Sequence, residues 1–82
     1  MELRQLRYFL EIADQGTFSR AAEALSITQP ALTAQIQKLA SEIGGQLFHR
    51  TPRGIALTDV GEVVREQGRR AVDAADATLR IG

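Results

Sequence analysis

The feature that most constrains the fold is a pair of short helical segments joined by a very tight link. Residues 18–25 and 29–43 carry apolar residues at helical spacing, with only Ser26-Ile27 and one capping residue between them. Ala21 and Ala22 give the first segment almost no side-chain bulk, so another helix can approach it closely. In the second segment, the predicted buried stripe consists of Leu32, Ile36, Leu39 and Ile43. Two helices around so short a turn predict a helix-turn-helix.

The opposite face of the second helix carries short polar side chains. Thr28 is the expected N-cap, and Pro30 falls in the first turn, where a missing N–H costs nothing. The major groove of DNA admits a helix, and its base edges pair with amide and hydroxyl groups. Gln29 can bond adenine in bidentate fashion, and Pro30 and Ala31 can contact a thymine methyl. The predicted DNA-binding residues on this helix are Thr28, Gln29, Pro30, Ala31, Thr33, Gln37 and Lys38.

The segment after this helix changes from a helical to a strand-like pattern. Gly44-Gly45 stops the helix, and residues 47–48 and 55–57 form two short apolar runs around Thr51-Pro52-Arg53-Gly54. This pattern predicts a hairpin, or wing, that presents Arg50 and Arg53 at its tip. Arg53 is placed to enter a narrow minor groove.

The charge distribution favours a nucleic-acid partner although the formal net charge is zero. Residues 28–57 hold Lys38, Arg50 and Arg53 against Glu42 alone, so the positive excess lies in the predicted binding region. A phosphate backbone meets this local patch and not the average charge of the chain.

Two further helices are expected on either side of this unit. Residues 3–14 form the first, ended by Gly16, and a long helix capped by Thr58 extends to about residue 80. Along the long helix, a 4-3 spacing typical of a coiled-coil seam connects Val60, Val64, Gln67, Ala71, Ala74, Thr78 and Ile81. Such a helix has no other evident burial partner in the chain, so this seam is predicted to form a homodimer.

Composition excludes several other classes of function. The chain has no cysteine, a single histidine and no glycine-rich phosphate loop, so no metal, cofactor or enzymatic activity is expected. It also lacks an apolar run long enough for a membrane span or a secretory signal, so a cytoplasmic location is expected. The remaining alternative is a protein-interaction module on the same scaffold. That module should expose Leu, Phe or Tyr where this chain carries Gln29 and Thr33.

These segments together resemble a known family. Residues 18–33, FSRAAEALSITQPALT, resemble the helix-turn-helix signature of LysR-type transcriptional regulators. LFHR at 47–50, Arg53-Gly54 and LTDVG at 57–61 resemble the wing and the start of the linker helix in that family. The resemblance implies a mainly α fold, with a winged helix-turn-helix domain over residues 1–57 and a dimerising linker helix over residues 58–82. Ala34 departs from the family, since many members have an arginine there on the recognition helix.

The resemblance also implies a function. We expect sequence-specific binding of double-stranded DNA by a bacterial transcription regulator, as a homodimer on an interrupted inverted repeat. The helix at about 29–43 would enter the major groove, and the wing arginine the minor groove. Family members continue into a C-terminal effector-binding domain of two α/β lobes, through which a small molecule would act. The sequence leaves open whether two such dimers form a tetramer in the full-length protein.

Overall fold

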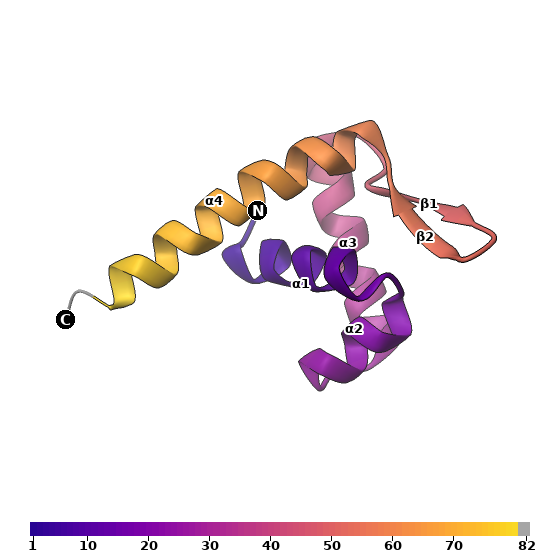
Figure 1. Ribbon diagram of the computed structural model, residues 1–82, viewed down its shortest axis with the longest axis horizontal. Coiled ribbons are helices and arrows are strands. Elements are labelled where there is room, and N and C mark those ends of the chain that lie inside the picture. The colour runs from indigo at the N-terminus through magenta and orange to yellow at the C-terminus, as the bar shows by residue number, and fades with distance from the viewer. Residues whose placement is uncertain (81–82) are drawn as a thin grey trace.

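The computed structural model describes residues 1–80 and shows a helical domain with a two-stranded wing. In chain order its elements are α1 (Leu3–Gln15), α2 (Phe18–Leu25), α3 (Gln29–Ile43), β1 (Phe48–Thr51), β2 (Gly54–Leu57) and α4 (Asp59–Leu79). Figure 1 shows the hairpin projecting at one end, while α4 runs away from the body of the domain toward the opposite end. The predicted mainly α fold with a wing is confirmed. None of the helices within residues 1–80 combines the length and apolar character needed to cross a bilayer.

Local capping fixes the helix boundaries, as the sequence predicts. The hydroxyl oxygens of Thr17 and Thr28 accept hydrogen bonds from backbone N–H groups one turn into α2 and α3. Gly16 and Gly44 end α1 and α3 in the left-handed conformation, with φ of 80° and 89°. Ser26 adopts the same region with φ of 57°, which lets the chain reverse between α2 and α3 within a few residues.

The core lies where α1 packs against the helix pair. Phe9, Ile12, Leu32 and Leu39 are its largest fully buried side chains. Ala21 and Ala22 are also buried, which confirms that their small size admits a neighbouring helix. Ile43 does not join the buried stripe as predicted and is 37% exposed. It lies in the last turn of α3, where its neighbours Glu42 and Gly44 are exposed as well.

The wing is longer than the apolar runs indicate. β1 and β2 pair from Phe48–Leu57 to Thr51–Gly54, which leaves Pro52-Arg53 as the loop. Leu47 precedes β1 and is a core residue with 2% exposure, not a strand residue as predicted.

Aromatic contacts join the wing to the helices. The Phe48 ring lies 5.2 Å from that of Phe9 and 5.7 Å from that of Phe18, measured between centroids.

At the other end of the hairpin, a Cβ on Gly54 would lie 3.2 Å from the Gly16 carbonyl oxygen. Gly54 has a φ of 135°, so both its conformation and this close approach favour glycine.

The position of α4 corrects one prediction. Because α4 packs along α1, it does have a burial partner within the chain. Its buried residues are Gly61, Gly68 and Val72, and a Cβ on Gly68 would lie 3.4 Å from a Leu6 methyl carbon. Amphipathic spacing alone missed this contact, since glycines do not mark an apolar stripe.

Two long-range ion pairs add to the packing of α4 on α1. Arg7 donates to Asp76 across 2.7 Å, and Arg69 donates to Asp14 across 3.2 Å. The hydrogen bond from Arg7 lowers the pKa of the Asp76 carboxyl below its usual value and raises that of the Arg7 guanidinium. Both pairs are partly exposed, so they orient the two helices more than they stabilise the fold.

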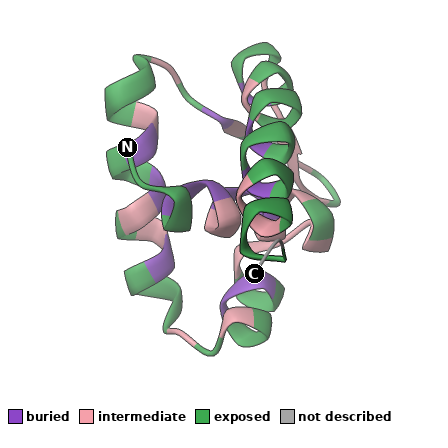
Figure 2. Cartoon of the chain, turned by 90° about the vertical axis from the view of Figure 1, so that its left-hand side faces the viewer, coloured by how far each residue is buried: buried purple, intermediate pink, exposed green. Residues whose placement is uncertain are grey.

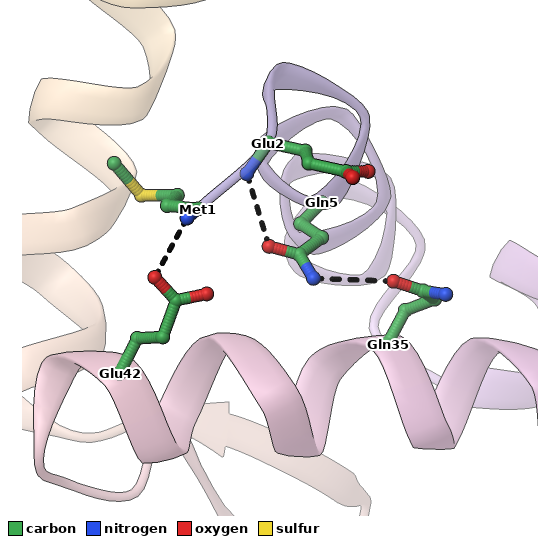
Figure 3. Close-up of polar contacts among 5 residues, drawn as sticks. All are labelled: Met1, Glu2, Gln5, Gln35 and Glu42. Carbon is green, nitrogen blue, oxygen red and sulfur yellow. Dashed lines mark hydrogen bonds and ion pairs between the residues drawn. The ribbon is translucent and has the colours of Figure 1, made fainter.

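Polar contacts also fasten the start of α1 across α3 (Figure 3). Gln5 is only 5% exposed, and its amide nitrogen donates to the Gln35 carbonyl oxygen at 3.2 Å. Its own carbonyl oxygen accepts a hydrogen bond from the Glu2 backbone N–H. The amine of Met1 pairs with Glu42 at 2.6 Å. The middle and the end of α3 are thereby tied to α1 from the side away from the wing.

Candidate nucleic-acid interface

The polar face predicted for α3 is turned to solvent in the structure. Of the seven predicted residues on this helix and its cap, Thr33 is half-buried and the others are exposed. Thr28 uses its hydroxyl to accept from the Ala31 backbone N–H at 3.2 Å, so its first role is to cap the helix. The exposed side chains lie opposite the stripe of Leu32, Ile36 and Leu39 that holds α3 in the core.

An open hollow lies between the helix pair and the wing. Its lining includes Gln29, Thr33, Gln37 and Arg50 from the predicted set, and β1 adds His49. The hollow therefore brings together residues from α3 and β1 that lie well apart in the sequence. The other predicted residues do not line it: Thr28, Pro30, Ala31 and Lys38 belong to α3 and its cap, and Arg53 lies at the wing tip.

Ser19 is a member of this hollow that the sequence analysis missed. Its hydroxyl donates to the side-chain carbonyl oxygen of Gln29 at 2.9 Å. Nothing in the sequence around this small exposed serine of α2 predicts the contact. Its partner belongs to another helix, on the far side of a turn.

The cations of the predicted patch are electrostatically free. Among residues 1–80, Lys38, Arg50 and Arg53 take part in no ion pair, and Arg20 shares this property. By contrast, each of the five arginines Arg4, Arg7, Arg65, Arg69 and Arg70 is paired with a carboxylate. The positive charge left uncompensated on α3 and the wing is thus available to phosphates.

Comparison with known proteins identifies this arrangement. Residues 3–62 match the family model described as a bacterial regulatory helix-turn-helix protein of the lysR family.

The chain belongs to the lysR family.

Relatives in this family are similar along nearly the whole chain. The regulator BudR of Klebsiella aerogenes is 47% identical over 79 residues, which cover 96% of this chain and 55% of BudR. The regulator TfdT of Cupriavidus pinatubonensis is 49% identical over 80 residues, which cover 98% of this chain and 35% of TfdT. The lysR-family chain therefore spans about half or less of the length of these relatives. Both are named as transcription regulators, in agreement with the expectation that this chain is not an enzyme.

Solved structures give the same result for the fold. A crystal structure of the BenM_DBD in complex with catB site 1 DNA is 36% identical with a TM-score of 0.93, and covers 99% of this chain and 91% of that one. This lysR-family chain accordingly has the winged helix-turn-helix fold of that DNA-binding domain.

A second candidate surface of the lysR-family domain lies on α4. One side of this helix carries no charged residue, and we call this side the uncharged flank. It consists of Val60, Val63, Gln67, Ala71, Ala74 and Thr78. All six are exposed, and Val63 reaches 62%. In Figure 2 most of the α4 ribbon is coloured as exposed. Val64, predicted in the seam, is half-buried beside the core, and Ile81 lies outside the described residues.

Proposed function

We propose that this domain binds double-stranded DNA sequence-specifically as a homodimer on an interrupted inverted repeat. In each half-site α3 enters the major groove, and Arg53 of the wing enters the adjacent minor groove. The observation that carries the proposal is the exposed polar face of α3 together with the cations Lys38, Arg50 and Arg53, which form no ion pair with a carboxylate of residues 1–80. One of the similar structures is a complex of BenM_DBD with DNA, which supports this choice of partner.

The geometry disfavours a protein-interaction module. Among residues 1–80 the exposed large apolar side chains are Met1, Leu3, Ile43, Val60, Val63 and Leu79. Only Ile43 belongs to α3, and it lies in the last turn, away from Gln29 and Thr33. A docking face for a protein would instead concentrate aromatic or large aliphatic groups at its centre.

The proposal extends to the pairing of two copies. The uncharged flank of α4 would form the dimer contact and set the separation of the two α3 helices, and hence the spacing of the half-sites. A small-molecule effector would act through a part of the protein outside this chain. The protein would act in the bacterial cytoplasm, where the DNA lies.

Selection of bound duplexes from a random library tests the proposal directly. The expected result is an enriched motif with two-fold symmetry and a fixed gap between its halves. Enrichment of no motif, with equal retention of all duplexes, would leave only non-specific electrostatic binding and refute sequence-specific recognition.

The Gln29→Ala variant is expected to bind the selected site about 1–3 kcal/mol more weakly and to lose preference at one base pair in each half-site. Gln29 is exposed at the first position of α3 and lines the hollow, which supports a contact between its amide and a base edge. Titration of the selected duplex and of a random duplex measures the effect. An equal loss on both would show that Gln29 does not read a base.

Replacement of the wing arginine should have a different signature. For Arg53→Ala we expect weaker binding to every duplex, with the larger loss where the minor groove under the wing is A·T-rich and narrow. The slope of log K against log salt should shrink by about one for each contact removed, so by roughly two for a dimer. Arg70→Ala, which removes an arginine paired with Glu66 on α4, is the matched control and should keep the slope. A slope unchanged in both variants would place Arg53 away from the DNA.

A further inference from the structure

We propose that Ser19 determines which base Gln29 recognises, by engaging the carbonyl oxygen of the Gln29 side chain and leaving its NH₂ group to face the groove. This inference rests on the proposed DNA binding and names a specificity residue within it. The contact that carries it is the hydrogen bond from the Ser19 hydroxyl to the Gln29 carbonyl oxygen, at 2.9 Å.

Both ends of this hydrogen bond are attached to well-fixed backbone. Ser19 is the second residue of α2, whose first turn is held by the bond from the Arg20 N–H to the Thr17 hydroxyl at 3.1 Å. Gln29 is the first residue of α3, whose first turn is held in the same way by Thr28. The two helices are in turn packed against each other, and Ala21 and Ala22 of α2 are buried. The Gln29 side chain can still rotate about its own torsion angles. The hydrogen bond from the Ser19 hydroxyl restricts this rotation in the protein without bound DNA.

The engaged carbonyl changes the chemistry that Gln29 offers. A free glutamine amide presents an acceptor and two donors, which matches the N6 amino group and N7 of adenine. The hydrogen bond from Ser19 occupies one of the two lone pairs of this oxygen and holds the carbonyl toward α2, so the NH₂ group is the end turned toward a base. Donors require acceptors, which are N7 and O6 of guanine, O4 of thymine and N7 of adenine. In adenine the N6 amino group beside N7 is itself a donor and would face the donating NH₂ group, so adenine becomes the poorer match at this position.

The test is a double-mutant cycle in which the affinity of each variant is measured for each base pair at the position that Gln29 contacts. The wild type, Ser19→Ala, Gln29→Ala and the double variant are titrated against the selected duplex. They are also titrated against three duplexes in which the base pair read by Gln29 is replaced by each alternative. That pair is located as the one whose identity no longer matters in Gln29→Ala. Ser19→Thr, which keeps a hydroxyl at this position, is the matched control.

We expect the wild type to prefer guanine or thymine over adenine at this position. Ser19→Ala should shift the ratio of affinities toward adenine by about fivefold or more, while Ser19→Thr keeps the wild-type preference. In the Gln29→Ala background, the Ser19→Ala change should leave that ratio unaltered. If guanine is preferred, 7-deazaguanine, which lacks the N7 acceptor, should weaken the wild type and leave Gln29→Ala unaffected.

Other outcomes would overturn the inference in distinguishable ways. An equal loss on all four duplexes, present also in the Gln29→Ala background, would make Ser19 a phosphate contact. A wild type that prefers adenine and weakens when adenine is replaced by purine, which lacks the N6 amino group, would show bidentate reading by Gln29. Both results refute the role of Ser19 and leave the proposed function intact. Absence of any sequence preference in the wild type would refute the role of Ser19 and the proposed function together.

Discussion

A variant that carries both Ala71→Glu and Ala74→Arg is expected to be a folded monomer that has lost most of its affinity for a full site. Both alanines are exposed on the uncharged flank, so the new charges disturb no contact within the chain but would be buried between two paired α4 helices. Linking two half-site contacts raises affinity by about 10²–10⁴ over one, and this gain should disappear. Sedimentation measures the mass, and titration of full-site and half-site duplexes measures the loss.

The chain offers a control on the same helix. Ala77 is also exposed but lies among the charged residues of α4, so Ala77→Arg should keep both the dimer and the full-site affinity. Half-site affinity should be the same in all three proteins, because the α3 face is unaltered. If the double variant remains a dimer with full affinity, the interface lies elsewhere, and the first place to examine is α1 around Leu3 and Arg7.

The second large effect is expected from Gly61→Ala. A Cβ at this position would overlap the backbone carbonyl oxygen of Leu47, which accepts the Thr58 N–H at 3.1 Å. Thr58 in turn donates its hydroxyl to the Gln46 carbonyl oxygen at 2.6 Å and caps α4 by accepting from the Gly61 N–H. Because the obstructing atom is backbone, relief requires α4 to move off this link. We expect the free energy of unfolding to fall by about 1–3 kcal/mol, as denaturant titration would show.

Gly68→Ala provides the matched comparison. It makes the same change in the same helix, but its Cβ would lie at ordinary contact distance, 3.4 Å from a Leu6 methyl carbon. Since alanine is favoured over glycine inside a helix by about 1 kcal/mol, this variant should be as stable as the wild type or more so. Equal stability of the two variants would show that the approach of Leu47 to Gly61 places no constraint on α4.

The helix boundaries and the exposed face of α3 were predictable because their causes are local. Thr17, Thr28 and Thr58 each cap a helix by bonding a backbone N–H three residues along. The stripe of Leu32, Ile36 and Leu39 requires only that α3 has a core side, which leaves Thr33 and Gln37 on the surface or near it. The excess of cations around the wing was likewise visible, since it depends on counting charges in one segment.

What the sequence could not determine is how the helices lie against one another. The seam from Val60 to Ile81 was derived as if α4 stood alone. The structure instead packs α4 on α1 through Gly61, Gly68 and Val72, and the fold then decides which flank stays exposed. The ion pair of Arg7 with Asp76 joins residues 69 positions apart, and Ser19 reaches Gln29 across a turn. Capping and periodicity act within a turn or two of helix, so they determined the elements of this protein. Contacts between elements depend on how closely two segments approach in space. Glycine and serine permit such an approach but add no apolar periodicity to the sequence, so only the tertiary structure decided these contacts.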